Sequence, residues 1–459
     1  MTMDIDAILE SQHAFFKSGT TLDPRWRSER LKELARALDK WEKPLCDALW
    51  ADLHKSANEA FLTEIGMVRS EISSAARSVR RWARREKVST PIACMPARSY
   101  IIKEPLGTAL IVSPWNYPVQ LLLNPLVGAI AAGCTAVLKP SPYVPNVSET
   151  IDRMLSETFP KEYIAVVQGN REINRKLFSC RWDIIFFTGS PSLGRVVMEA
   201  AAPNLTPVVL ELGGKSPCII DRSADVELAA RRCAWGKTLN SGQTCIAPDY
   251  LLVHRDIKDE FVDAFKRQIA ILHGENPRLD KHYARMVSDS AFARVSSYLS
   301  EGSVLCGGHT DSSQRYIEPT LLGDIAPDSK VMTEEIFGPV FPMIVLDDRG
   351  SSFADKVVSF VTSREKPLAF YYFGDEKSGW DLLSRTSSGG SCINDTIMHI
   401  ANPNLPFGGV GNSGMGSYHG RLSFEAFTHR RSVIVSSRLI DLPFRYMPYR
   451  FFGVTRKLL

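Results

Sequence analysis

The stretch DIIFFTGSPSLG, residues 183–194, sets an apolar run directly before a glycine-rich turn and a helix start. The run DIIFF predicts a buried strand, and Pro191 suits the first turn of a helix. Free N–H groups at such a helix start can bind a phosphate, although Arg195-Val196 stands where a P-loop has Lys-Ser/Thr. The stretch therefore indicates a strand–turn–helix unit, and its turn is either a phosphate site or a plain connection.

The same unit recurs on both sides of this stretch. Near-continuous apolar strands that alternate with helices indicate a parallel sheet covered on both faces, and such sheets bind ligands beyond the carboxyl ends of their strands. We therefore expect an α/β fold with two such units. The first has strands at 108–112, 135–139, 163–167, 183–187 and 207–211, separated by helices near 118–132, 146–158, 171–178 and 191–202. The second has strands at 217–221, 250–254, 340–346 and 368–373 and helices at 225–239 and 256–271, and amphipathic helices at 28–51 and 58–86 precede both.

Composition excludes several classes of function. The 459 residues are 44% apolar and 23% charged, with a net charge of +4, which is ordinary for a globular protein and gives no reason to expect a nucleic-acid partner. The nine cysteines contain no C-x-x-C pair and the nine histidines form no cluster. We expect reduced thiols, a cytoplasmic location and no metal site.

No segment has the pattern of a signal peptide or a membrane span. The N-terminus carries acids, and the apolar run at 121–138 is interrupted by Asn124-Pro125 and Gly133, which favours a buried helix followed by a strand. VIVSS, within 432–437, predicts an edge strand. The basic and aromatic tail that follows is too short to span a bilayer, and we expect it to pack on a second subunit rather than to lie on a membrane.

Cys245 lies in NSGQTCIAPD, residues 240–249, between a helical pattern and the strand at 250–254. A turn flanked by Gly242 and Pro248 can present a sulfur atom to a cleft, and a thiolate is a strong nucleophile. A buried and inert cysteine is the alternative, and it is the reading we prefer for Cys46, Cys134 and Cys233, which lie within apolar patterns.

Three polar residues follow predicted strands and would lie at one edge of the sheet. Glu211 ends PVVLE and could activate a water, Asn116 follows TALIV and could donate to an oxyanion, and Lys139 ends TAVLK and could hold a cofactor hydroxyl. Their structural alternatives are a salt bridge to Lys215, a helix cap and a solvated charge. The glycines of Gly409–Gly414 spell G-x-G-x-x-G, but no strand precedes them and no acid follows at the required spacing, so we expect a loop there.

Several motifs together resemble the aldehyde dehydrogenase superfamily. SPWNYP, LKPS, FFTGSPSLG, LELGGKSP, NSGQTC, EEIFGPV and LPFGGVGNSGMG occur in that family's order, from about residue 25 to 436. The short N-terminus and the form NSGQTCIAPDY are similar to the class 3 branch, which includes fatty and aromatic aldehyde dehydrogenases. The resemblance implies two doubly wound parallel-sheet domains, one Rossmann-like for the cofactor and one catalytic, with a small β element for bridging and oligomerisation. The cofactor domain would comprise 1–98, 106–210 and 400–430, the catalytic domain 211–399, and the bridging segment 99–105 and 431–459.

The resemblance also implies roles for single residues. Cys245 would attack an aldehyde, Asn116 and the Cys245 N–H would stabilise the oxyanion, and Glu211 would activate the water that releases the acid. NAD or NADP would bind at Trp115, Lys139, Ser141, Gly189, Ser190, Gly194, Leu212, Glu335 and Phe337. Tyr117 and Trp235 would line the aldehyde tunnel. Independently of the resemblance, the apolar content near Tyr117, Trp235 and Ile393 favours medium or long aliphatic or aromatic aldehydes over charged ones. Apart from the resemblance, the edge strand expected near 432–436 suggests a homodimer.

One departure bears on the cofactor. Related sequences often read K-P-S-E, whereas this chain reads Lys139-Pro-Ser-Pro142. Because an acid there would repel a 2′-phosphate, its absence favours use of NADP. Three alternatives stay open at this point: a CoA-acylating dehydrogenase, which would not need Glu211; a cysteine hydrolase, which would need a histidine partner; and a non-catalytic binding protein on the same scaffold.

Overall fold

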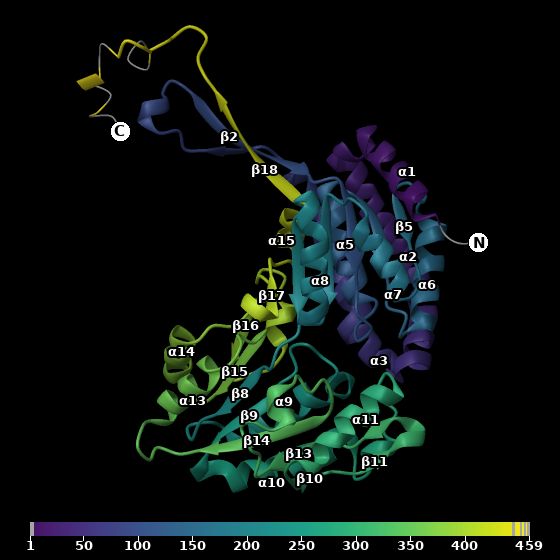
Figure 1. Ribbon diagram of the computed structural model, residues 1–459, viewed down its shortest axis with the longest axis vertical. Helices are drawn as coiled ribbons and strands as arrows, with labels where there is room; N and C mark the ends of the chain where they lie inside the picture. The colour runs from purple at the N-terminus through teal and green to yellow at the C-terminus, as the bar shows by residue number, and fades with distance from the viewer. Residues whose placement is uncertain (1–3, 443–445, 450–451, 454–455, 457–459) are drawn as a thin grey trace.

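The computed structural model describes residues 4–442, 446–449, 452–453 and 456. Figure 1 shows two α/β lobes and a long arm, formed by β2 and β18, that leaves the first lobe. Parts of the basic tail expected to pack on a second subunit, at 443–445, 450–451, 454–455 and 457–459, lie outside the described residues. Within the described part, no helix combines the length and the apolar character that crossing a bilayer requires.

The first lobe is built on a six-stranded sheet with the order β17-β7-β6-β3-β4-β5, in which only β17 runs antiparallel. Its strands are β3 (Thr108–Val112), β4 (Thr135–Lys139), β5 (Ile164–Val166), β6 (Ile184–Gly189), β7 (Val208–Leu212) and β17 (Gly414–Met415). The register places Val112 beside Lys139 and Gly189 beside Leu212. The carboxyl ends of the parallel strands therefore meet at one edge, as expected from the sequence.

Helices cover both faces of this sheet. One face packs on α2 (Pro24–Leu53), α4 (Gly66–Trp82), α5 (Gln120–Ala132) and α6 (Pro145–Thr158), and the other on α1 (Ile5–Lys17), α7 (Arg171–Ser179) and α8 (Pro191–Ala201). Every residue of α5 is buried. The apolar run at 121–138 is thus an enclosed helix that ends at Gly133, whose φ is +96°, and continues into β4.

The second lobe holds a seven-stranded sheet with the order β10-β13-β14-β9-β8-β15-β16, parallel except for β10. Its strands are β8 (Pro217–Ile220), β9 (Tyr250–His254), β10 (Ser303–Cys306), β13 (Thr320–Gly323), β14 (Val340–Leu346), β15 (Ala369–Phe373) and β16 (Gly390–Ile393). One face packs on α9 (Val226–Thr238) and α10 (Lys258–His273), and the other on α11 (Asp289–Ser297), α13 (Phe353–Thr362) and α14 (Glu376–Arg385). The two-lobe α/β layout is as expected, whereas the residue boundaries of the domains stay a prediction.

The arm is a three-stranded antiparallel sheet, β1 (Glu86–Val88), β2 (Arg98–Pro105) and β18 (Thr428–Val435), with β2 in the middle. The strand expected near 432–436 is therefore the end of a longer edge strand. Large apolar side chains are exposed on the arm and just beyond it: Ile434, Val435, Leu439 and Ile440.

The helix expected at 58–86 is broken in a way that matters for the site. The structure has α3 (Ala57–Ala60), a π-helical turn η2 (Phe61–Ile65) and then α4, which ends at Trp82. A π turn inserts one extra residue per turn, and such turns are frequent at functional sites. Here the turn buries Glu64 completely.

Candidate active site

The loop that carries Cys245 is an unusual piece of backbone. After α9 ends, Asn240, Ser241 and Gly242 follow one another with φ values of 50°, 52° and 71°. A Cβ on Gly242 would lie 2.3 Å from the carbonyl oxygen of Gly338, so only glycine fits there. Left-handed backbone on non-glycine residues is strained and tends to occur at functional sites.

Gln243 fixes this loop from inside the protein. Its side-chain amide donates to the carbonyl oxygens of Asn240 and Arg285, each at 3.0 Å, and its Oε1 accepts from Val287 N at 3.0 Å. The next residue, Thr244, makes a 2.6 Å hydroxyl contact with Tyr117. These hydrogen bonds therefore hold the two residues before Cys245 in place, although Cys245 itself is partly exposed.

Asn116 joins the first lobe to this loop. It lies between β3 and α5, is 2% exposed, and its Nδ2 donates to the carbonyl oxygen of Gln243 at 3.0 Å. The carbonyl oxygen of Asn116 accepts from Asn240 Nδ2 at 2.8 Å. The carboxyl edge of the first sheet thus meets the loop before β9, at the amino edge of the second sheet, and Cys245 lies at that junction.

The carboxyl groups of Glu211 and Glu335 both lie close enough to the Cys245 thiol to affect its pKa. Burial raises the pKa of Cys245 to about 12, and the charges of Glu335 and then Glu211 contribute in the same direction, whereas the N–H groups of Cys245 and Ile246 oppose the shift. Two carboxylates and two main-chain N–H groups therefore act on one sulfur atom. Such a convergence at a cleft is typical of an active site.

Glu211 itself is enclosed and unpaired. Its side chain is 3% exposed, neither carboxyl oxygen accepts a hydrogen bond from any residue that the structure describes, and burial raises its pKa well above the usual range. It makes no salt bridge to Lys215, which pairs with Asp249 instead. The glycine pattern at Gly409–Gly414 ends in β17, where Gly414 pairs with Glu211, so this loop lies against the main chain of Glu211 and is not a strand-to-helix turn. A free carboxylate in a dry site has the properties of a general base.

Glu335 and Phe337 lie on the opposite wall. A Cβ on Gly213 would stand 2.1 Å from Glu335 Oε2, so the absence of a side chain on Gly213 lets the carboxyl group lie against the LELGGKSP turn. Burial, followed by the charge of Asp249, raises the pKa of Glu335 to about 8. Phe337 has a φ of 50°, and its ring meets that of Trp115 edge-on with centroids 5.4 Å apart. Two aromatic rings, one from each lobe, therefore meet near the thiol loop.

The turn at Gly189–Gly194 opens α8, and Ser190 caps that helix by accepting from Leu193 N. A Cβ on Gly194 would lie 2.7 Å from Leu212 Cδ2, so glycine allows α8 to approach β7 closely. Ser190 is exposed, which leaves the helix N-terminus open to an anion. These features fit the pyrophosphate of a dinucleotide.

Lys139 and Ser141 follow β4 at the same edge. Lys139 is 1% exposed, its Nζ donates to the carbonyl oxygen of Pro140 at 2.7 Å, and burial lowers its pKa to about 8. It is therefore not the solvated charge that we held as the alternative. A buried ammonium group with donors to spare fits a ribose hydroxyl, which supports a cofactor at this edge.

The three residues expected to bind substrate are placed differently. Tyr117 lies beside Cys245, whose charge contributes to the raised pKa of the Tyr117 hydroxyl, and Trp235 is half-buried on α9 in the core cluster that Cys245 contacts. Ile393 is a correction, because neighbouring residues of a strand point to opposite faces. Cys392 packs on the Cys245 side of the sheet, whereas Ile393 packs with the α13 and α14 cluster and reaches Gly379.

Several residues of the site have no local sequence signal. Lys55, Glu64 and Asn240 contact the Asn116 loop, and the charges of Glu211 and Cys245 contribute to the raised pKa of the buried Tyr418. Lys55 lies between the two helices expected from the sequence, and Glu64 reads as an ordinary polar position of the second. Tyr418 follows LPFGGVGNSGMG, and its place beside the site depends on the return of the chain to β7.

Comparison with known proteins agrees with this geometry. The aldehyde dehydrogenase family model matches residues 1–433. The 4,4'-diaponeurosporen-aldehyde dehydrogenase of Staphylococcus aureus is 44% identical over 440 residues, which cover 95% of each chain. The dimeric NADP-preferring aldehyde dehydrogenase of Mus musculus is 41% identical over 435 residues, again 95% of each chain. A solved structure described as the substrate-bound state of Staphylococcus aureus AldH matches with a TM-score of 0.96 and 42% identity over 99% of both chains.

Proposed function

The chain belongs to the class 3 branch of the aldehyde dehydrogenase family and oxidises aldehydes with NAD or NADP, and on this premise we propose that Cys245, Asn116 and Glu211 carry the reaction and that its substrates are long apolar aldehydes. The observation that supports the residue roles is their convergence: Asn116 binds the loop of Cys245, and the charge of Glu211 reaches the thiol.

In the first step the sulfur of Cys245 bonds to the aldehyde carbon. The thiol proton leaves to solvent water, so Glu211, whose oxygens have no partner among the described residues, is still free to act as a base in the later step. The carbonyl π electrons move to the oxygen, which becomes an oxyanion. Asn116 Nδ2 carries two hydrogens and donates one of them to the carbonyl oxygen of Gln243. The second hydrogen can therefore be donated to the oxyanion, together with the N–H of Cys245.

In the second step the tetrahedral carbon loses a hydride and a thioester remains on Cys245. When bound, the nicotinamide ring supplies the hydride acceptor. Lys139, Ser141, Gly189, Ser190, Gly194, Leu212, Trp115, Glu335 and Phe337 are the residues that would hold the dinucleotide. Glu211 then takes a proton from water, the hydroxide adds to the thioester carbon, the C–S bond breaks, and the acid and the Cys245 thiolate separate.

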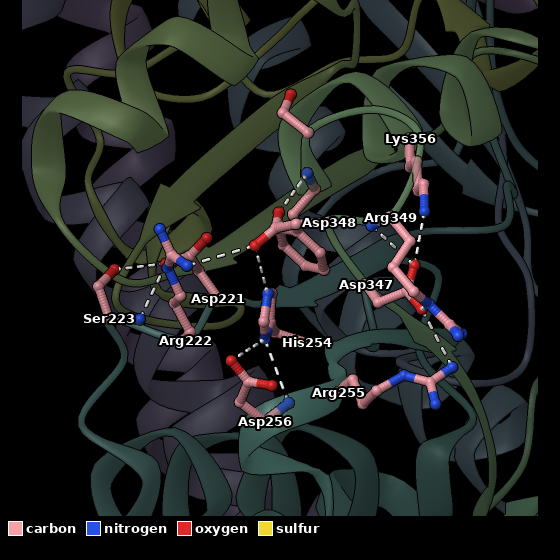
Figure 2. A network of polar contacts seen from close by, with 12 residues as sticks. Asp221, Arg222, Ser223, His254, Arg255, Asp256, Asp347, Asp348, Arg349 and Lys356 are labelled. Carbon is pink, nitrogen blue, oxygen red and sulfur yellow. Dashed lines mark hydrogen bonds and ion pairs between the residues drawn. The ribbon is translucent and has the colours of Figure 1, made fainter.

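The other chemistries are not favoured. A CoA-acylating enzyme has no use for a buried, unpaired Glu211. A cysteine hydrolase needs a histidine beside its thiol, but His254, the last residue of β9, pairs with Asp348 at the far end of that strand (Figure 2). Cys245 precedes the near end of that strand.

A cavity of about 530 Å³ supports the proposed substrate class. Apolar residues form part of its lining, namely Phe61, Leu62, Met67, Ile400, Ala401 and Pro403. His419 also lines the cavity. It is next in sequence to Tyr418, and the charges of Glu211 and Cys245 contribute to the raised pKa of the Tyr418 hydroxyl. The relative from Staphylococcus aureus is named for a carotenoid-type aldehyde, which fits a long apolar chain in such a cavity.

A panel of linear aldehydes tests this proposal, with reduced cofactor followed by absorbance and NAD and NADP run in parallel. Each added methylene should lower KM up to about fourfold, because burying one is worth about 0.8 kcal/mol. A preference for short or charged aldehydes would contradict the proposed substrate class. Absence of any aldehyde oxidation would contradict the catalytic assignment as well.

We propose that NADP is accepted at least as well as NAD. Pro142 is exposed and uncharged at the position where a carboxylate would repel the 2′-phosphate. Pro142→Glu should lower kcat/KM for NADP more than for NAD. Strict use of NAD by the unchanged enzyme would refute this proposal.

We propose a homodimer in the cytoplasm. The exposed apolar residues of the arm need a cover, and a relative is named dimeric. All nine cysteines are free, which suits a reducing compartment. Light scattering should give twice the chain mass, and Ile434→Glu should shift the equilibrium toward the monomer.

A further inference from the structure

A fully enclosed ion pair lies directly behind the loop that carries Asn116. Lys55 Nζ and Glu64 Oε1 are 2.6 Å apart, and both side chains are 0% exposed. Removing two charges from water costs more free energy than most such pairs return, so an apolar pair of similar volume is often as stable. Stability of the fold alone therefore does not account for this pair.

Each partner also holds one end of the segment between β3 and α5. Lys55 Nζ donates to the carbonyl oxygen of Asn116 at 3.0 Å and lies 4.2 Å from the centre of the Tyr117 ring. Glu64 Oε2 accepts from Val119 N at 2.8 Å and more weakly from Gln120 N at 3.4 Å. The pair thus holds the main chain of Asn116 from one side and the start of α5 from the other.

The position of Glu64 depends on the π-helical turn η2. The sequence from 57 to 82 continues as a helix on both sides of this turn, and only here does the backbone widen. The carboxylate reaches the N–H groups that start the next helix, an arrangement that suits a negative charge. The π turn and the ion pair therefore act together to hold residues 116–120 in position.

We infer that Lys55 and Glu64 are positioning residues that hold Asn116 where its side-chain amide can meet the oxyanion. The inference rests on the proposed role of Asn116. Both side chains are fully buried, and the pair acts through the main chain of the loop. Misplacing an oriented donor by about 1 Å can cost about 10²-fold in rate.

The test is the double variant Lys55→Met/Glu64→Leu, which replaces the pair by apolar side chains. We expect kcat to fall about 10²-fold, while KM, the Kd for NADP and the rate at which iodoacetamide alkylates Cys245 each stay within twofold. The decisive readout is a cycle with Asn116→Ala. If the pair acts through Asn116, the triple variant has the same kcat as Asn116→Ala alone.

A control variant removes a partly exposed polar contact in the second lobe. His254 Nε2 and Asp348 Oδ2 are 3.2 Å apart beyond β9 (Figure 2), and His254→Leu/Asp348→Asn should leave kcat unchanged. Glu64→Gln keeps the shape of the side chain and serves as a second variant if the double variant does not fold; it should lower kcat about tenfold. Unchanged kcat in either variant, or losses that multiply with Asn116→Ala, would overturn the inference. A wild-type enzyme that oxidises no aldehyde would instead refute the proposed function.

Discussion

Asn116 Nδ2 donates a 3.0 Å hydrogen bond to the carbonyl oxygen of Gln243, and this contact links the end of a strand in one lobe to the loop of Cys245 in the other. The two lobes therefore do not merely face each other at the cleft. They share a hydrogen bond through the residue proposed to stabilise the oxyanion, so a change in the packing of either lobe alters the geometry of the reaction.

Asn116→Ala should lower kcat by about 10²–10³-fold, because loss of one oxyanion donor costs this much in other enzymes. Single-turnover formation of reduced cofactor checks the effect on the chemical step. Asn116→Asp is the stringent companion, since its carboxylate would repel the oxyanion and should slow the step at least as much. A change below twofold in the alanine variant would remove Asn116 from the mechanism.

The pKa of Cys245 predicts how the free enzyme reacts with alkylating agents. Because burial and two neighbouring carboxylates raise this pKa to about 12, the thiolate is scarce at neutral pH. Alkylation of Cys245 by iodoacetamide should rise about tenfold per pH unit between about pH 7 and 10 without a plateau. Peptide mass spectrometry separates this site from exposed Cys94. A plateau above about pH 9 would show an ordinary thiol.

Gly194→Ala tests the dinucleotide site independently of the chemistry. The new Cβ would stand 2.7 Å from Leu212 Cδ2, so either the Leu212 side chain or α8 must shift. Overpacking of this kind costs about 1–3 kcal/mol, and we expect the Kd for NADP, measured by calorimetry, to rise about tenfold or more. Cys245 alkylation should not change. Glu199→Ala, an exposed site on the same helix, is the control, and equal cofactor affinity in both variants would contradict the assignment.

Glu335 predicts a pH dependence of stability. Burial raises the pKa of its carboxyl group to about 8, whereas in the unfolded chain it is about 4.3. Between these values the folded state binds the extra proton, so this group makes the protein less stable as pH rises from about 4.3 to 8. Glu335→Gln should therefore raise Tm over wild type by more at pH 8.5 than at pH 5. An equal gain at both pH values would show that the carboxyl group does not titrate in this way.

Much of the fold follows from the order of apolar runs and turns. The strands at 108–112, 135–139, 250–254 and 340–346 have the bounds expected from the sequence, because buried parallel strands are nearly continuous apolar runs. Lys139 ends one of these strands at the ligand edge, and Glu211 lies at the end of β7. The sequence therefore predicts the edge at which the site forms.

What the sequence does not predict depends on register and on long-range packing. Ile393 faces away from Cys245 because β16 pairs with β15 in a register that only the folded sheet defines. Lys55 lies between two predicted helices and Glu64 lies within the second, and both look like surface charges in the sequence. Only the π turn of the folded chain brings Glu64 inward. The unpaired state of Glu211 also has no local sign, since Lys215 could have reached it and instead pairs with Asp249.

The central claim is that the substrate is held as a thioester on Cys245 and released by a water that Glu211 activates. Rapid quench of Glu211→Gln mixed with aldehyde and NADP, followed by peptide mass spectrometry, tests this claim most directly. We predict one equivalent of reduced cofactor and one acyl group, located on Cys245, with slow turnover afterwards. Full turnover without an acyl group on Cys245, or an acyl group on another cysteine, would contradict the claim.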